Sequence, residues 1–419
     1  MTKKERNILI LLAALNFTHI LDFMIMMPLS NYLIPYFNIT AFQFSILVAA
    51  YSIAAFFSGL AVAMFIDKFD RKKSLFFAYI GFVLGTIACG FAHTYGLLLA
   101  ARIIAGLFGG VIGAQVLSIV ADMFVYERRG RAMGIVMGGF AGASILGVPI
   151  SLNLTNLFQK DWHVPFILIG GLGIIFIPII MKIVPSMTQH IKKENSKSLF
   201  EALINVCKVP AQRSAIIFSG LLMMGHFLII PFINPYLEFN KGFSKELTPW
   251  IYLAGGIASL LAAISLGKLA DKRGKLLVFS VSVFLSLFMV LIITRMPNVP
   301  FIVVLLFFAI WFVVATGRIV TAQAMISEVV TPSQRGSFMS VNGSIQQLGS
   351  GLAALCAGAI VYTDKAGKIH NYNWVGYFSI LILLISLLFG RVIFRKMDGQ
   401  ESQLKTEEEL VNDTADLIN

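Results

Sequence analysis

The sequence predicts an all-α membrane protein with twelve transmembrane helices in two pseudo-symmetric six-helix bundles, with both termini cytoplasmic. Three observations lead to this fold class. Apolar residues make up 58% of the chain and charged residues only 13%, whereas a soluble domain carries about 25% charged residues. Roughly twelve apolar runs reach the ~20 residues that a helix needs to cross a bilayer. A set of polar motifs also occurs twice, about half a chain apart.

The apolar runs are long and continuous, which is typical of transmembrane helices and excludes the alternating strands of a barrel. They lie near residues 7–29, 43–66, 75–92, 97–121, 132–153, 164–184, 213–237, 248–270, 276–294, 299–325, 337–361 and 375–394. No small-residue cleavage site follows the first run, so we expect a retained span and not a signal peptide. The spans leave no room for a soluble catalytic domain, so we expect no enzyme activity.

The basic residues predict the orientation. With the N-terminus inside, the cytoplasmic segments hold 25 of the 33 Lys and Arg residues, the outer loops hold six, and Arg102 and Arg318 lie within spans. This asymmetry follows the positive-inside rule. It accounts for the net charge of +12 without a nucleic-acid partner. We expect a multi-pass protein in the lipid bilayer of a plasma membrane, and the short loops favour a bacterial inner membrane.

A polar stretch at 185–212 divides the chain into an N-terminal bundle over 1–184 and a C-terminal bundle over 213–396. This cytoplasmic linker could carry a short surface helix at its centre or act as a flexible tether. The acidic segment 397–419 has few large apolar residues and is expected to be a disordered tail. The three cysteines lie in spans or in the linker, so we expect no disulfide, metal or cofactor site.

The repeated motifs indicate two homologous halves. The sequence DKFDR at 67–71 returns as DKRGK at 271–275, which is 204 residues later. Arg129-Gly130 returns as Arg335-Gly336, which is 206 residues later. Internal repeats of apolar segments are typical of secondary transporters, which bind substrate where the halves meet.

These loops resemble the loop signature of the major facilitator superfamily, and the resemblance covers essentially the whole chain. The second copy keeps the signature residues Gly267, Asp271, Gly274 and Lys275. The first copy departs from it, because Asp70 stands where the turn glycine is expected. An aspartate can adopt the left-handed conformation of such a turn at some cost.

By this resemblance the two loops would act as conformational latches on the cytoplasmic face, each through a relay of charged residues. The relay residues would be Asp67, Arg71 and Asp122 in the first half and Asp271, Lys275 and Glu328 in the second. The alternative is that these charges only follow the positive-inside rule. The resemblance also implies a monomer.

Segments within the spans are similar to those of proton-coupled exporters of the drug:H⁺ antiporter type. Arg102 opens a segment similar to the intramembrane arginine motif of these proteins. The segment 142–149 is similar to their Gly-Pro motif, with a valine between Gly147 and Pro149 as in sugar-efflux-like permeases. Its glycines allow close helix approach, and Pro149 frees a backbone carbonyl and bends the helix.

The first span carries a charged residue deep in its apolar run. Placing Asp22 near the bilayer centre costs roughly 2.5–3.5 kcal/mol on insertion scales, so such residues face a cavity, pair with a cation or carry protons. Asn16, His19 and Asp22 recur every three residues and therefore share one helix face, which would line the central cavity, with His19 as a further proton-coupling candidate. Arg102 is the natural partner of Asp22. Burial and a neighbouring cation both change the proton affinity of a carboxyl, so Asp22 could load and release protons. The alternative is a static ion pair.

The repeat places His226 opposite Asp22, 204 residues later, and predicts that the two face each other across the pseudo-two-fold axis. His226 would then be a proton relay or a substrate contact, or a packed histidine. Arg318 does not match Arg102 at the same offset. We expect it nearer the cytoplasmic end, where it would neutralise an anionic substrate group or extend to the interface.

Further polar residues within the spans are candidates to line a substrate cavity whose walls are mainly apolar. They are Asn16, Gln115, Asn234, Tyr236, Tyr252, Arg318, Asn342 and Gln346.

The sequence therefore favours a secondary active transporter that exports a small molecule, such as a drug-like amphipath, a sugar or a metabolite, in exchange for protons. The first alternative is a passive facilitator or a proton symporter that imports a nutrient. A more distant alternative is a non-transporting membrane sensor.

Overall fold

The computed structural model describes residues 2–65, 69–124, 126–159, 161–188, 204, 208–330, 335–364 and 366–416. The helices of the first half are α1 (Lys3–Ile25), α2 (Ser30–Phe37), α3 (Ala41–Phe65), α4 (Arg71–Gly90), α5 (Tyr95–Met123), α6 (Tyr126–Gly142), the π-helix η2 (Ala143–Gly147), α7 (Val148–Leu157) and α8 (Val164–Ile183). The linker at 185–212 falls largely outside the described residues, and so does most of the segment at its centre that could form a surface helix or a tether.

The second half repeats this order and adds a small hairpin. Its elements are α10 (Pro210–Phe227), α11 (Ile230–Pro235), the π-helix η3 (Tyr236–Asn240), the 3-10 helix η4 (Lys245–Leu247), α12 (Thr248–Arg273), α13 (Lys275–Thr294), α14 (Phe301–Glu328), α15 (Arg335–Ile360), the strands β1 (Tyr362–Thr363) and β2 (Ile369–His370), and α16 (Tyr372–Asp416). The strands pair antiparallel, with Tyr362 opposite His370.

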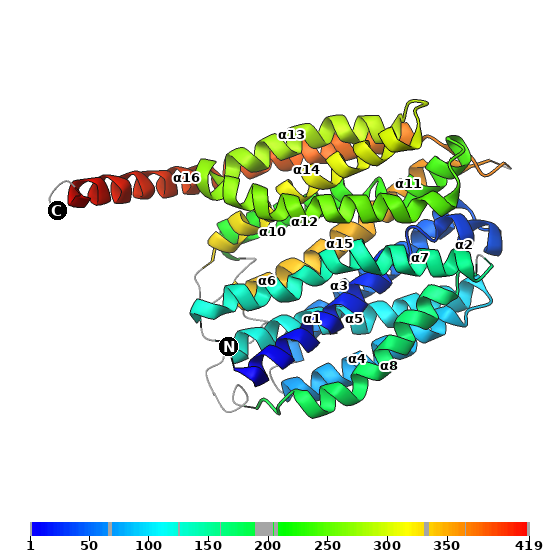
Figure 1. Cartoon of the computed structure of the whole chain (residues 1–419), viewed down its shortest axis with the longest axis horizontal. Helices are drawn as coiled ribbons and strands as arrows, with labels where there is room; N and C mark the ends of the chain where they lie inside the picture. The colour runs from blue at the N-terminus through cyan, green and yellow to red at the C-terminus, as the bar shows by residue number, and fades with distance from the viewer. Residues whose placement is uncertain are drawn as a thin grey trace.

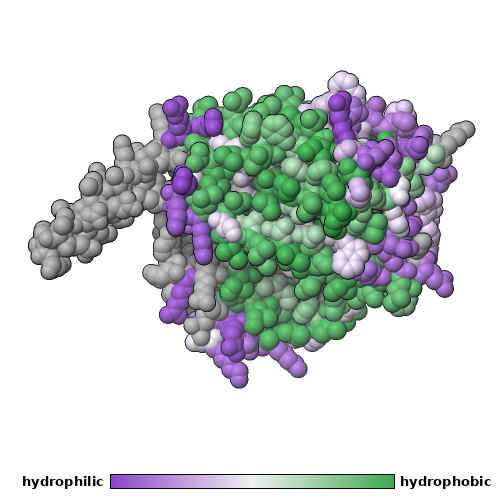
Figure 2. Space-filling model, turned by 45° about the horizontal axis from the view of Figure 1, so that its top comes forward, coloured by the Kyte–Doolittle hydropathy of each residue, from purple (hydrophilic) through white to green (hydrophobic). Residues whose placement is uncertain are grey.

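Each predicted apolar run corresponds to one of these helices or to a consecutive set of them. Eleven helices of the described chain are long and apolar enough to cross a membrane. The remaining predicted span, 337–361, corresponds to α15. This helix is long enough to cross a membrane, but its Ser, Asn and Gln residues lower its hydropathy, so it is not among the eleven. Figure 2 shows an apolar band around the helices between two hydrophilic ends, as a bilayer-embedded surface requires.

The first spans of the two halves are broken at equivalent positions. Pro28 lies between α1 and α2, and Pro231 lies at the start of α11. A proline lacks the amide hydrogen that would continue the helix, so both breaks have the same cause. The fifth span changes from α to π geometry over η2, directly before Pro149.

The two halves pack side by side (Figure 1). Between them, α3 lies along α15, α12 lies along η2 and α7, and α2 contacts α11. The larger apolar core crosses this boundary, where the rings of Phe23 and Phe227 lie 5.7 Å apart and those of Phe44 and Phe232 lie 6.3 Å apart. A second core lies within the first half, among α1, α4, α5, α6 and α8.

Both ends of the described chain lie at the same end of the bundle, at the left of Figure 1. The basic residues predict that this end is cytoplasmic. At this end α16 continues out of the bundle to Asp416, so residues 397–416 lie within a helix where the sequence predicts a disordered tail. Their many Glu, Gln, Lys and Leu residues are good helix formers and can extend an existing helix.

Candidate functional site

A buried ion pair lies inside the first bundle. Arg102, on α5, donates from Nη1 to Asp22 Oδ2 on α1 at 2.8 Å, and both side chains are fully buried. Thr86 Oγ1, on α4, donates to Asp22 Oδ1 at 3.1 Å. The guanidinium of Arg102 also lies over the ring of Tyr51, on α3, with 4.5 Å to the centroid. The contact expected between Asp22 and Arg102 is therefore present, and four helices meet at it.

The pair is electrically balanced. Two charges buried without water each carry a desolvation cost of several kcal/mol, which their mutual attraction and the added hydrogen bonds must offset. The carboxylate of Asp22 has a partner for each of its oxygens. Any event that protonates Asp22 removes the counter-ion of Arg102 and forces this cluster to rearrange.

The second bundle holds a buried arginine–histidine pair, which has a different charge. His226, on α10, accepts at Nδ1 from Arg318 Nη2, on α14, at 2.6 Å, and both side chains are buried. A guanidinium has only donors, so Nδ1 carries no proton and the imidazole is neutral. The ring of His226 stacks on Trp311 at 5.4 Å between centroids. This pair therefore keeps a net positive charge.

This arrangement bears on two expectations. His226 and Asp22 each bond to the arginine of their own half, and that they face each other across the pseudo-two-fold axis stays a prediction. Arg318 does not extend to the interface, because its exposed fraction is 0%. Arg318 and Arg102 each lie on the fourth long span of their half and pair with the first. They are not at the same register, because α5 and α14 begin at Tyr95 and Phe301, 206 residues apart, so Arg318 lies ten residues further along its helix than the repeat position of Arg102.

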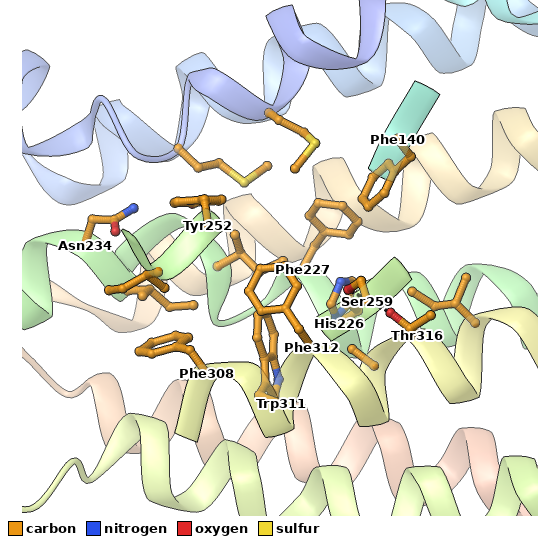
Figure 3. Close-up of a pocket in the computed structure, with 17 residues that line it drawn as sticks. Phe140, His226, Phe227, Asn234, Tyr252, Ser259, Phe308, Trp311, Phe312 and Thr316 are labelled. Atoms are coloured by element: carbon orange, nitrogen blue, oxygen red, sulfur yellow. Dashed lines mark hydrogen bonds between the residues drawn. The ribbon is translucent and has the colours of Figure 1, made fainter. Parts of the chain in front are cut away.

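A pocket of about 730 Å³, partly open to solvent, lies where the halves meet (Figure 3). Met24 and Met27 from the α1 side and Phe140 from α6 line one wall. The other walls come from α10, α11, α12 and α14. Their residues are His226, Phe227, Ile230, Ile233, Asn234, Ile251, Tyr252, Ser259, Phe308, Trp311, Phe312, Ala315, Thr316 and Ile319.

The pocket contains three of the predicted site residues, which are His226, Asn234 and Tyr252. Sequence reasoning missed its aromatic wall, above all Trp311, because an aromatic residue inside an apolar span has the same local pattern whether it faces lipid or a cavity. It also missed Ser259 and Thr316, whose hydroxyls are hydrogen-bonded to each other at 2.9 Å.

The other polar candidates of the first half lie within the helix packing. Asn16 donates to Val136 O at 3.0 Å and joins α1 to α6. His19 is buried between Tyr51 and Phe82, with ring centroids 6.2 Å from each, and neither ring nitrogen has a hydrogen-bond partner among the described residues. The amide of Gln115 is likewise buried and unpaired in the described chain.

The remaining candidates of the second half are outside the pocket. Asn342 is fully buried, and its amide has no partner within the described residues. Gln346 donates to Ser219 Oγ at 2.9 Å and to Gln323 Oε1 at 3.2 Å. Tyr236 packs against Tyr372, with 4.9 Å between ring centroids.

The latch residues lie at the end of the bundle where the chain termini are found. Arg71 Nε lies 3.2 Å from Asp122 Oδ2, and Lys275 Nζ lies 2.8 Å from Glu328 Oε1, so an ion pair within each half lies at this end. Asp67 lies outside the described residues. Gly267 and Asp271 lie on the last turns of α12. The pairs are present in both halves, and their role as latches stays a prediction.

Asp70 does not adopt the left-handed conformation that an aspartate can take at some cost. Its φ of −59° and ψ of 125° make it an N-cap of α4, whereas Gly274 at the equivalent place has a φ of 93°. Asp70 accepts hydrogen bonds from Lys72 N at 3.0 Å, Ser186 Oγ at 2.6 Å and Met187 N at 2.9 Å. Burial raises the pKa of Asp70, but these hydrogen bonds together outweigh it and leave the pKa below its usual value.

The helix-bending residues lie next to the first span. A Cβ on Gly147 would lie 2.7 Å from a methyl carbon of Leu21, so the glycine lets η2 approach α1 closely. Among the described residues no three His, Cys, Asp or Glu side chains gather into a group that could hold a metal ion.

Comparisons with known proteins agree with this architecture. The family model described as Major Facilitator Superfamily matches residues 12–317 and 215–417. An uncharacterized MFS-type transporter of Bacillus subtilis, YbcL, is 27% identical over 322 residues, which are 76% of this chain and 79% of the relative. A probable sugar efflux transporter of Helicobacter pylori is 22% identical over 361 residues, which are 86% of this chain and 89% of that protein.

Two solved structures share the fold. A bacterial homologue of the human lysosomal transporter Spinster, inward-facing and unoccupied, superposes with a TM-score of 0.74 at 14% identity, covering 96% of this chain and 99% of its own. The nucleoside transporter NupG, solved as a mutant, superposes with a TM-score of 0.70 at 14% identity, covering 92% of this chain and 100% of its own.

Proposed function

Because the chain belongs to the Major Facilitator Superfamily, we propose that it exports a small amphipathic molecule in exchange for protons, by alternating access of a central pocket. Membership makes the chain a multi-pass membrane transporter of small molecules. The direction of transport, the coupling to protons and the substrate class are the parts that we propose. The bacterial relatives are consistent with a bacterial inner membrane.

The observation that carries the proton-coupling proposal is the buried Asp22–Arg102 pair. Asp22 is the one carboxylate among the described membrane-embedded residues that is fully buried. Intramembrane carboxylates are costly and mark proton and ion pathways. Because the pair balances its own charge, protonation of Asp22 changes the net charge of the cluster and can be coupled to a structural change.

The position of the pair connects it to the boundary between the halves. Phe23, the residue after Asp22, packs on Phe227 of the second half. Tyr51 lies under the guanidinium of Arg102, and the next residue, Ser52, accepts a hydrogen bond from Ser350 of α15 at 3.1 Å. Rocking of the halves would therefore move direct neighbours of Asp22 and Arg102, and with them the access of water to the carboxyl.

The pocket is the proposed substrate site, because residues of both halves line it and would open it to each side in turn. Its polar lining groups are few, and its walls are mostly Phe, Met, Ile, Trp and Tyr side chains. A free sugar would leave several hydroxyls without partners, which is costly in a desolvated site. The lining therefore favours an amphipath over a free sugar.

A facilitator is the second candidate, and the completeness of the Asp22 site is the observation that favours it. Both carboxylate oxygens have partners, so the pair could be a static link between α1 and α5. In that case transport would proceed without protons.

Inside-out membrane vesicles distinguish the two candidates. Uptake of a panel of lipophilic cations, alkyl sulfonates and sugars would be measured with and without an imposed proton gradient. We expect gradient-driven uptake in the wild type and its loss in Asp22→Asn at equal protein level. The matched control is Ser286→Ala, because Ser286 is fully buried in α13, bonds only to Ser282 O among the described residues and lies away from the pair.

Gradient-driven uptake that survives in Asp22→Asn would contradict the proton role of Asp22. Uptake that never depends on the gradient, in wild type and mutant alike, would identify a facilitator.

A further inference from the structure

The two bundles differ in the charge of their buried arginine sites. In the first bundle the cation Arg102 is neutralised by Asp22 at 2.8 Å. In the second, Arg318 is fully buried, and the side chain that it contacts, His226, is neutral because Nδ1 accepts the hydrogen bond. No carboxylate pairs with Arg318 in the described chain. An unpaired charge away from water is strongly unfavourable, so this site lacks an anion.

Arg318 also has unused donors. Its Nε and Nη1 are buried without a hydrogen-bond partner within the described residues. Nε and Nη2 of Arg102 are too, but Arg102 has Asp22 as its counter-ion, whereas Arg318 has no carboxylate partner in the described chain. Buried donors in native proteins nearly always have partners, and each exception calls for an explanation such as an absent ligand or ion. A carboxylate, sulfonate or phosphate oxygen is the acceptor that a guanidinium binds best.

The pocket gives a ligand access to this pair. His226 lines the pocket, and its Nδ1–Arg318 contact leaves the ring N–H at Nε2 without a bond to any other described residue (Figure 3). Ala315 and Ile319, which flank Arg318 on α14, line the same wall. An anionic oxygen in the pocket could therefore accept from His226 Nε2 while Arg318 donates to Nδ1, so that the imidazole extends the positive charge of Arg318 to the ligand.

We propose that the transported substrate is a small organic anion with an apolar body, and that His226 and Arg318 bind its charged group. The inference rests on the proposed function, since it names the substrate class of that pocket. The Met, Phe, Ile and Trp side chains of the pocket would hold the apolar body. The substrate would thereby supply the negative charge that Asp22 supplies in the first bundle.

Binding to the purified full chain in neutral detergent tests the proposal without any transport. Calorimetry would compare decanoate with decanamide, which has the same length and shape but no charge. A hydrogen-bonded charge in a buried site is worth about 1.5–3 kcal/mol, so we expect decanoate to bind about tenfold or more tightly than decanamide. Equal affinities for the two probes would overturn the proposal from the wild-type protein alone.

Two variants test whether Arg318 is the residue that makes the protein prefer decanoate over decanamide. Arg318→Gln should bind both probes alike, with the affinity for decanamide unchanged. The matched control is Arg391→Gln, because Arg391 lies on α16 and donates to a neutral partner, Ser280 Oγ, at 3.2 Å; this variant should still prefer decanoate. A preference for decanoate that persists in Arg318→Gln would contradict the proposal.

A third arm separates a soluble anion from a lipid headgroup. Phosphatidylglycerol added to the same titration should not compete with decanoate, and competition would assign the site to lipid and overturn the substrate assignment. The outcome is independent of proton coupling. Anion binding with no gradient-driven exchange would refute only the antiport mechanism, and exchange of neutral or cationic amphipaths without a preference for anions would refute only this inference.

Discussion

Removing Arg102 while Asp22 is kept should reveal how strongly the two charges depend on each other. In Arg102→Met the carboxylate of Asp22 keeps one hydrogen bond, from Thr86 at 3.1 Å, and loses its 2.8 Å contact with the cation. Both side chains are fully buried, so no water replaces the lost partner in this conformation. Breaking a buried pair by removing one partner costs about 3–5 kcal/mol.

Removing both charges should cost much less. In the double variant Asp22→Asn/Arg102→Met no buried charge remains, and replacement of a whole buried pair by neutral groups is often close to neutral in stability. We therefore expect the double variant to be more stable than Arg102→Met alone, with a coupling energy of about 2–3 kcal/mol.

The assay is reversible unfolding of the purified protein in mixed micelles, or thermal unfolding where reversibility fails, for the wild type, both single variants and the double variant. Additive effects of the two substitutions, within about 0.5 kcal/mol, would refute the view that the pair is one electrostatic unit. They would also remove the main physical support for the proton-coupling proposal.

Two further predictions concern close packing and the cap of α4. A Cβ on Gly256 of α12 would lie 3.0 Å from the backbone nitrogen of Ile145, across the boundary between the halves. Gly256→Leu should therefore keep the halves apart and lower the free energy of unfolding by about 1–3 kcal/mol. It should also abolish transport in vesicles. Gly171→Leu, where a Cβ meets nothing within 4 Å, is its control, and equal activity of the two variants would contradict this packing argument. Asp70→Ala should cost about 1 kcal/mol as a lost N-cap. Because the pKa of Asp70 is lowered in the folded state, its contribution is complete above the unfolded pKa of about 3.9 and is lost as pH falls through the folded value. The difference in melting temperature between wild type and Asp70→Ala should therefore stay constant from pH 7 to about pH 5 and narrow at lower pH. A difference that does not narrow at lower pH would show that the ionised carboxylate adds nothing to the cap.

The sequence was sufficient for the parts of the fold that follow from solvent and charge. Apolar runs of sufficient length become helices in a bilayer whatever their neighbours, so each predicted span has its counterpart. Asp22 and Arg102 could be matched because isolated charges inside apolar runs need partners.

The second bundle shows where such reasoning fails. His226 lies at the repeat position of Asp22, but Arg318 lies ten residues further along α14 than the repeat position of Arg102, so the fixed offset does not predict that the two pair. Phe308 and Phe312 line the pocket, whereas Phe284 and Phe288 are about half exposed on the outer surface of α13. These pairs have the same spacing in equally apolar helices, so only the packing of the bundles distinguishes them.

The backbone conformation of Asp70, in the turn before α4, could not be predicted from the residue type alone. An aspartate can cap a helix or take the left-handed conformation, and Asp70 caps because Ser186 and Met187 supply donors from a distant part of the chain.

The most direct test of proton antiport is the proton movement that a substrate gradient drives. Sealed proteoliposomes would hold a transported member of the panel inside, with a pH-sensitive dye trapped in the lumen, and would be diluted into substrate-free buffer at equal starting pH. Antiport predicts that the lumen becomes acidic as substrate leaves, and that Asp22→Asn gives no acidification. Alkalinisation of the lumen would identify a symporter, and an unchanged lumenal pH during substrate efflux would contradict proton coupling altogether.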